Sequence, residues 1–158
     1  TSGGIRVNLE QVRIPDFLES RAMASQTGGN EIRFAKHHFW AERLDEAIAK
    51  VLVRDIRHAS AFADIARGDR GARCVLRAEF DRFHAADNGR VLVSGRYSLE
   101  SKETVERAEF DFSQAATGSG YASSVSGLRN ALADLARQIA AIVENTTACR
   151  EPAAADDT

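Results

Sequence analysis

The sequence predicts an α+β fold, a two-layer α/β sandwich in which two long helices cover one face of a mainly antiparallel sheet. Three consecutive segments between residues 72 and 113 alternate apolar with charged or polar side chains, as half-buried strands do. Two other segments, 40–56 and 121–142, repeat apolar residues at the helical spacing of three and four. Antiparallel sheets tolerate one apolar and one charged face, which parallel sheets rarely do.

The composition is that of an ordinary globular protein. The 158 residues favour one domain, which we expect at 1–145, followed by a mostly unstructured tail at 146–158. Hydrophobic residues make up 44% and charged residues 28%, and the formal net charge is −2 with both signs mixed throughout. A nucleic-acid partner is therefore not expected, because it would require a basic stripe. No apolar run approaches the roughly 20 residues that cross a bilayer.

The first forty residues are expected to form a strand, a short turn and a hairpin. Residues 5–9, IRVNL, alternate like a strand, and a bulge near Glu10-Gln11 would return the later apolar residues to the same face. Pro15 ends this strand, and PDFLES is typical of a single helical turn. MASQT and EIRFAK flank Gly28-Gly29-Asn30, whose residues accept the positive φ of a hairpin turn.

A corner is predicted at His37-His38-Phe39-Trp40, where the second hairpin strand turns into a helix. From Trp40 onward the apolar residues fall on one stripe, with charged residues mostly opposite. We therefore expect Trp40 to lie in the core at the helix start. The stripe consists of Trp40, Leu44, Ile48, Val51, Leu52 and Ile56.

Three strands and a final helix are expected to complete the domain. The strands are placed at 72–84, 91–101 and 106–113, and their polar face is predicted to be a solvated surface. This face carries Arg77, Glu79, Arg96, Arg107 and Glu109. Residues 121–144 have apolar side chains at spacings of 4, 3, 4, 3, 4 and 3, which favours a helix packed on the sheet over a coiled-coil seam.

Metal-site chemistry finds little support in the sequence. His37 and His38 are adjacent on a predicted strand, so their side chains point to opposite faces and cannot easily share one ion. No H-E-x-x-H pattern is present, and no motif surrounds His58 or His84. The two cysteines form no C-x-x-C pattern, which disfavours zinc.

Catalytic motifs are also missing. There is no G-x-S-x-G nucleophile elbow. Residues 118–127, GSGYASSVSG, open a helix and could hold an anion, but they lack the lysine of a phosphate-binding loop. Asp45-Glu46 lie on the first predicted helix, where a solvated face is favoured over an acid–base pair. We therefore predict no catalytic, cofactor-binding or metal-binding residues, and a protein that is not an enzyme.

Cys74 and Cys149 allow one disulfide. A final helix over 121–144 would span roughly 36 Å, nearly the length of eleven strand residues at about 3.3 Å each. Its end would then return to the start of strand 72–84, where Cys74 faces the helices. The sequence leaves two alternatives open, a bridge between the two cysteines or a buried thiol and a free thiol.

The order of elements and several motifs resemble the PqiC-like family of ABC-type transport auxiliary lipoproteins over residues 5–144. The resemblance rests on the strand-ending turn, the segment before the first helix, the hairpin RAEFDRF to GRVLVSGRYSL and the helix that begins at Tyr121. The matching positions in the first two motifs are Ile14, Pro15, Phe17, Leu18, Asn30, Glu31, Ile32, Trp40, Ala41, Leu44 and Asp45. The resemblance gives these residues structural rather than catalytic roles.

This resemblance implies an accessory protein of MCE-type lipid transport in the Gram-negative envelope. Such a protein is expected in the periplasm, attached by lipid to the outer membrane, without a cofactor, bound to an MCE-domain partner and assembled as a homo-oligomer. The lipidated cysteine of the family's mature N-terminus is not among these residues, so the anchor rests on the resemblance. Two alternatives stay open: a free-standing periplasmic domain that binds a small molecule or lipid, and a hydrolase with an unrecognised site.

Overall fold

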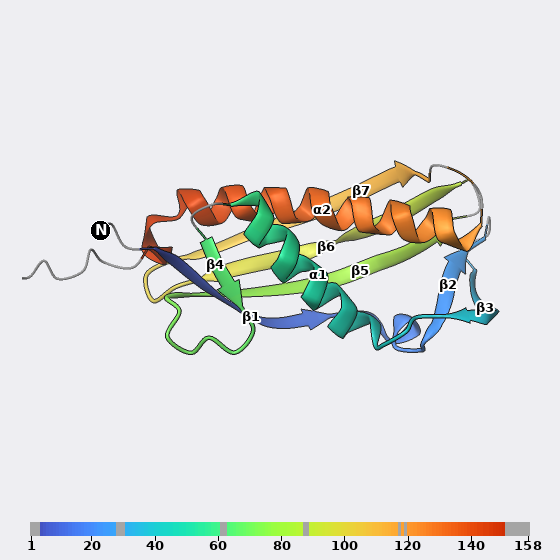
Figure 1. Cartoon of the computed structure of the whole chain (residues 1–158), viewed down its shortest axis with the longest axis horizontal. Coiled ribbons are helices and arrows are strands. Elements are labelled where there is room, and N and C mark those ends of the chain that lie inside the picture. The colour runs from blue at the N-terminus through green and yellow to red at the C-terminus, as the bar shows by residue number, and fades with distance from the viewer. Residues whose placement is uncertain are drawn as a thin grey trace, which may run out of the picture.

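The computed structural model describes residues 4–27, 31–60, 63–86, 89–116, 118 and 120–150. Within them lie seven strands, two α-helices and two short 3₁₀ turns (Figure 1). The strands are β1 Ile5–Arg13, β2 Ala22–Gln26, β3 Ile32–Phe39, β4 Ala63–Ala66, β5 Cys74–Ala86, β6 Arg90–Glu100 and β7 Val105–Ala115. The helices are α1 Leu44–Ala59 and α2 Tyr121–Asn145, and the turns are η1 Asp16–Leu18 and η2 Thr147–Cys149.

The sheet is mixed, with β5 at its centre. One edge of β5 pairs in parallel with β1 and, further along, with β2, while the other edge pairs antiparallel with β6. The outer strands are β4, parallel to β1, β3, antiparallel to β2, and β7, antiparallel to β6. The predicted meander β5–β6–β7 and hairpin β2–β3 are confirmed, although the hairpin turn at 28–30 lies outside the described residues.

The prediction of a mainly antiparallel sheet is wrong, because three of the six pairings are parallel. The chain leaves β1, passes through α1 and returns in β4 beside β1, and such a crossover produces parallel neighbours. β4 has only four residues and was not predicted. The one-sided alternation of β5, β6 and β7 correctly indicated a face open to solvent, but it carried no information about which strand borders β5 on its other edge.

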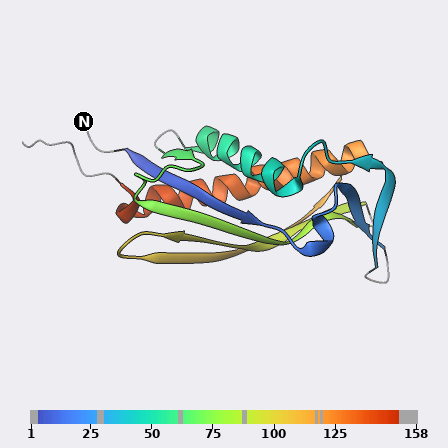
Figure 2. The ribbon, with the colours of Figure 1, turned by 90° about the horizontal axis from the view of Figure 1, so that it is seen from below.

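Both helices lie on the same side of the sheet (Figure 2). α1 packs against β1 and β4, α2 packs against β5, β6 and β7, and the helices contact each other. The buried residues form one core between the helices and the sheet. Its largest fully buried side chains are Phe80, Ile5, Leu9, Ile48, Leu52, Ile56, Ile65, Leu76, Leu99, Leu128, Leu135 and Ile139.

Bulges keep the apolar residues of two strands on the helix side. The register of β1 against β5 shifts between Leu9 and Gln11, which confirms the predicted bulge. A second shift occurs in β5 just after Phe80, opposite Gly95 of β6. A Cβ on Gly95 would lie 2.0 Å from the carbonyl oxygen of Glu79, so only glycine fits this close approach.

The corner before α1 differs from the prediction. α1 begins at Leu44, four residues after Trp40, and its first backbone bond joins the Ala47 N–H to the Arg43 carbonyl. The Trp40 N–H donates instead to the Arg21 carbonyl at 2.7 Å, which holds Trp40 beside the β2–β3 hairpin. Trp40 is half-buried and packs against the core, with its ring 6.3 Å from that of Phe83, so it lies at the margin of the core and before the helix rather than at the helix start.

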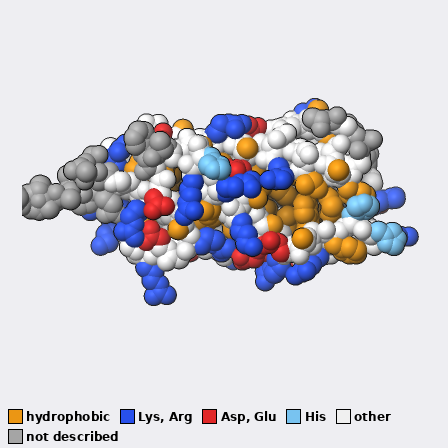
Figure 3. Space-filling view, in the orientation of Figure 1, with side chains coloured by type: hydrophobic (Ala, Val, Ile, Leu, Met, Phe, Trp, Pro, Cys, Tyr) orange, Lys and Arg blue, Asp and Glu red, His pale blue; other side chains and the backbone are white. Residues whose placement is uncertain are grey.

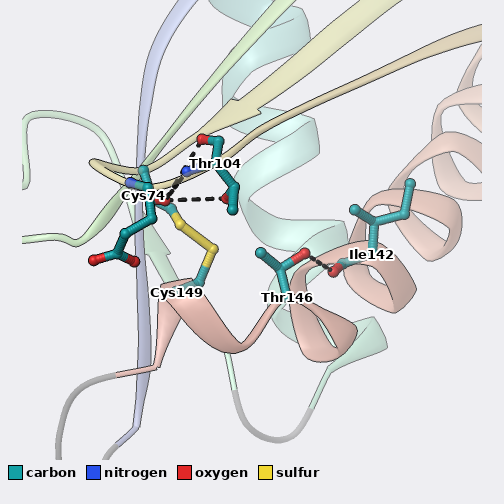
Figure 4. Close-up of a disulfide and its surroundings, with 7 residues drawn as sticks. Cys74, Thr104, Ile142, Thr146 and Cys149 are labelled. Atoms are coloured by element: carbon teal, nitrogen blue, oxygen red, sulfur yellow. Dashed lines mark hydrogen bonds between the residues drawn. A yellow bond between two sulfur atoms is a disulfide. The ribbon is translucent and has the colours of Figure 1, made fainter.

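The chain closes on itself covalently at the end of α2. Cys74 of β5 and Cys149 of η2 form a disulfide with a Cα–Cα distance of 5.2 Å, and the Thr146 hydroxyl donates to the Ile142 carbonyl at 2.7 Å (Figure 4). Arg150 then forms an antiparallel bridge with Ile5. The disulfide holds Cys149, at the end of η2, in a buried position against β5, within the first residues of the segment predicted to be a mostly unstructured tail. Residues 151–158 lie outside the described part.

Candidate functional site

The titratable side chains of the described residues were expected to form no metal site. No cluster of three or more histidine, cysteine, aspartate or glutamate side chains within them is arranged to hold a metal ion. His37 and His38 are exposed on β3, and His58 is exposed on α1. In the same residues, neither helix is both long and apolar enough to cross a membrane.

The family-motif residues occupy structural positions, and two of them meet at a pocket. Pro15 precedes η1 and Leu18 ends it in a buried position, while Leu44 is the first, buried residue of α1. Asn30 lies outside the described residues. Trp40 and Tyr121, which are far apart in the sequence, line the same cavity.

This cavity lies in what we call the apolar end, formed by β2, β3, Trp40 and residues 120–133 at the start of α2. Its volume is about 190 Å³. The lining residues come from β2, the end of β5 and the first two turns of α2, and they are Met23, Ala24, Ser25, Trp40, Ala85, Gly120, Tyr121, Ser124 and Leu128. Figure 3 shows hydrophobic side chains gathered on the surface over this part of the molecule.

Exposed aromatic side chains lie at the cavity, where Tyr121 forms part of the lining, and on the neighbouring strand β3. Phe39 is 60% exposed, Phe34 is 46% exposed and Tyr121 is 38% exposed. The ring of His38 stacks on that of Tyr121 with a centroid distance of 3.8 Å and an interplanar angle of 18°, which joins the end of β3 to the first residue of α2. Grouped exposed apolar residues of this kind mark interaction surfaces more often than isolated ones do.

Basic side chains predominate at the apolar end. Segments 22–27, 32–40 and 120–133 contain Arg33, Lys36 and Arg129. The nearest acidic residues along the chain are Glu31, just before β3, and Asp134, which pairs with Arg137. The first turn of α2 has no acidic residue, so the positive end of the helix dipole adds to the basic character of this end. The apolar end is therefore suited to contact an apolar group next to negative charge.

The open face of the sheet has the opposite character, because its charges alternate and pair with one another. The strand registers place Arg13, Glu79, Arg96 and Glu109 in one row across four strands. The guanidinium of Arg96 lies 3.0 Å from the Glu79 carboxylate, and Arg77 binds both Glu10 and Glu100. A shallow hollow of about 500 Å³ follows these strands. Exposed pairs of this kind are worth roughly 0–1 kcal/mol each, as expected of a solvated surface.

One histidine is buried beneath η1 on this face. His84 is 2% exposed, its Nε2 lies 3.2 Å from the Gln26 Oε1, and the ring of Phe17 meets it edge-on at 5.5 Å. Its Nδ1 has no hydrogen-bond partner among the described residues. Burial, with the charge of Arg82 as a smaller cause, lowers the pKa of His84 to about 4, so the imidazole is neutral at pH 7.

A family model and curated relatives match this chain. The model is described as the ABC-type transport auxiliary lipoprotein component and matches residues 1–140. The Escherichia coli (strain K12) protein named Intermembrane transport lipoprotein PqiC is 26% identical over 114 residues, which cover 72% of this chain and 61% of that protein. The matched part thus spans about three fifths of that relative's length.

Two crystal structures share the fold. A protein described as uncharacterized has a TM-score of 0.85 at 24% identity, covering 88% of this chain and 92% of that one. The Xanthomonas campestris protein XCC0632, of the DUF330 family model, has a TM-score of 0.75 at 13% identity, covering 89% and 86%. At these identities the likeness shows the architecture alone.

Proposed function

Because the chain belongs to the family of ABC-type transport auxiliary lipoprotein components, we propose that it is a non-catalytic accessory subunit of an MCE-type lipid transport system in the Gram-negative envelope. In this proposal the protein lies in the periplasm, is held to the outer membrane by a lipid, and binds an MCE-domain protein. An ATPase elsewhere in the system supplies the energy. The observation that carries the proposal is the family match over residues 1–140.

The structure is compatible with such a role in two respects. The apolar end offers an exposed aromatic surface of the kind found at protein interfaces. Strands β3, β4 and β7 lie at sheet edges, each paired on one side only within the described residues. Such edges present unpaired backbone groups, so they are the candidate contacts for the proposed homo-oligomer.

We expect an MCE-domain protein to be encoded beside this gene, and binding to that protein tests the proposal. Co-expression and affinity purification should yield a stable complex that survives gel filtration, and the gene neighbourhood should also encode a permease and an ATPase. Failure of the purified MCE-domain protein to bind at micromolar concentration would contradict the proposal.

A second candidate function is a free-standing periplasmic domain that binds a small molecule or lipid. The cavity at the apolar end favours it, but its volume of about 190 Å³ is below the roughly 300–1,000 Å³ typical of small-molecule sites. Mass spectrometry of organic extracts from the purified protein separates the two candidates. A stoichiometric co-purified lipid would favour this second function.

A further inference from the structure

We propose that the apolar end is the docking surface for an acidic segment of a protein partner, which places one apolar side chain in the cavity between Trp40 and Leu128. This inference rests on the proposed function, since it names the surface and the partner chemistry through which an accessory subunit would bind. It is carried by three features of the apolar end: the size of the cavity, the sign of its charges and its position in the molecule.

The size of the cavity fits a side chain better than a whole ligand. A volume of about 190 Å³ is too small for an ordinary small-molecule site but sufficient for one aromatic or aliphatic side chain. The energetically dominant residues of protein interfaces are commonly such anchors, each seated in a desolvated pocket and surrounded by weaker contacts. Trp40 is half-buried at this cavity, and the exposed Phe34 and Phe39 belong to the adjacent strand.

The sign of the charges selects the partner. Arg33 and Lys36 are exposed on β3 and Arg129 is exposed on α2, while the nearest acidic residues along the chain are Glu31, before β3, and Asp134, which pairs with Arg137. A symmetric contact with a second copy would bring these basic residues together, which like-charge repulsion disfavours. An acidic segment is instead attracted to this surface, and charge complementarity of this kind raises the association rate and makes it dependent on salt.

The position of the apolar end favours a protein over a membrane. The first described residues and the Cys74–Cys149 disulfide lie at one extreme of the elongated molecule, and β3 with the start of α2 lies at the other (Figures 1 and 2). In the proposed function the lipid is attached on the N-terminal side of β1. The apolar end is then the part of the domain most distant from that attachment point.

The test uses biolayer interferometry to measure binding of the purified MCE-domain protein that we expect to be encoded beside this gene. Arg33→Glu/Lys36→Glu reverses two exposed charges of the apolar end, and its control, Arg70→Glu/Lys102→Glu, makes the same charge change near Ala148 at the disulfide end. Phe34→Ser/Phe39→Ser removes the exposed rings. Its control, Val105→Ser, replaces a side chain that is 45% exposed on β7.

The expected result is at least a tenfold increase in Kd for each apolar-end variant and less than a twofold change for each control. The wild-type affinity should also fall more steeply between 50 and 500 mM NaCl than that of Arg33→Glu/Lys36→Glu. All positions are exposed, so circular dichroism should show unchanged folding.

The contrary outcomes are distinguishable. Full binding by both apolar-end variants would overturn the docking surface while leaving the proposed function intact, whereas no binding by the wild type would overturn both. Equal losses in test and control variants would show non-specific charge attraction and overturn the inference. Two further measurements test other occupants in the case where MCE binding does not depend on Arg33 and Lys36. Flotation with phosphatidylglycerol vesicles that depends on these residues would assign the surface to a membrane and overturn the inference. Concentration-dependent light scattering that depends on them would assign the surface to a second copy and equally overturn it.

Discussion

The two ends of the molecule differ in how completely their apolar side chains are buried. At one end Ile5, Cys74 and Cys149 are all fully buried, and a disulfide and a backbone bridge to Arg150 close the sheet against η2. At the other end the same strand, β5, terminates beside an open cavity, with Trp40 half-buried and Phe39 largely exposed. Regions that bind partners are commonly drawn from the less stable parts of a fold, so the difference suggests that stability and recognition are divided between the two ends.

The largest expected effect comes from breaking the disulfide end. The bridge closes a loop with a sequence separation of 75, and replacing both cysteines by alanine should lower the free energy of unfolding by roughly 4 kcal/mol through the entropy of the unfolded chain. Urea unfolding of the oxidised wild type and of Cys74→Ala/Cys149→Ala measures this difference. Thiol counting on the denatured, unreduced protein should find no free thiol, and two thiols per chain would show that the ends do not differ in this way.

The next largest effect is a pH dependence of stability that arises near the apolar end. His84 lies near the β2 side of the apolar end with a pKa of about 4, below its value of about 6.5 in an unfolded chain. Between these two pH values His84 is protonated in the unfolded state but neutral in the folded state. Its contribution to the free energy of unfolding is therefore present above pH 6.5 and is lost as pH falls toward 4. Lowering the pH from 7 to 4.5 should therefore cost roughly 2 kcal/mol through this residue.

Urea unfolding at both pH values should show that His84→Leu abolishes this part of the pH dependence, while His37→Leu, at an exposed position, leaves it unchanged. At the disulfide end, the hydrogen bond from Arg6 lowers the pKa of Asp69. The contribution of Asp69 to the free energy of unfolding is therefore lost only as pH falls below the usual carboxyl range. At pH 4.5 the protection of backbone amides from hydrogen exchange should therefore be lost first in β2. Loss of protection in β1 before β2 would reverse the expected order.

The disulfide end was the more accessible of the two from the sequence. The helical spacing of apolar residues in α2 and the lengths of β5 and α2 indicated that Cys149 returns toward Cys74 if the last three strands form a meander, although a bridge and two separate thiols both stayed open. The apolar end depended on pairings between distant segments. Trp40 falls on the helical stripe of Leu44 and Ile48, but its N–H bonds to Arg21 in another segment, and periodicity within one segment does not report such a bond.

The same limit explains the other corrections. The parallel neighbour of β5 is β1, and nothing in the alternation of either strand specifies that pairing. The cavity at the apolar end depends on how far α2 extends over β2, so only Trp40 and Tyr121 of its lining residues were named as family-motif positions. Gly120 and Ser124 were considered only as part of segment 118–127, as a possible anion site. Trp40 and Tyr121 were selected because of the family resemblance, whereas the predominance of basic residues in these segments is visible in the sequence once their proximity is known.

A smaller effect is expected from Trp40→Ala. A fully buried tryptophan would cost about 3–5 kcal/mol on truncation, but Trp40 is half-buried at the cavity, so we expect roughly 1–2 kcal/mol. Urea unfolding measures this loss. The same variant should reduce the free energy of binding to the MCE-domain partner by more than it reduces the free energy of unfolding. A loss of 3 kcal/mol or more would show that Trp40 belongs to the core and that the two ends are equally well packed.

The smallest expected effect on stability comes from Phe39→Ser. The Phe39 side chain is 60% exposed on edge strand β3, so its removal should change the free energy of unfolding by less than about 0.5 kcal/mol, as surface substitutions usually do. If the apolar end serves recognition, this variant should still dissociate faster from the MCE-domain partner, because most effects of interface substitutions occur in the dissociation rate. Val105→Ser, at an exposed position on β7, should change neither quantity. Paired measurements of unfolding and of dissociation therefore separate the two roles. A Phe39→Ser protein that loses stability but dissociates at the wild-type rate would show that the apolar end is an imperfectly packed part of the fold rather than a docking surface.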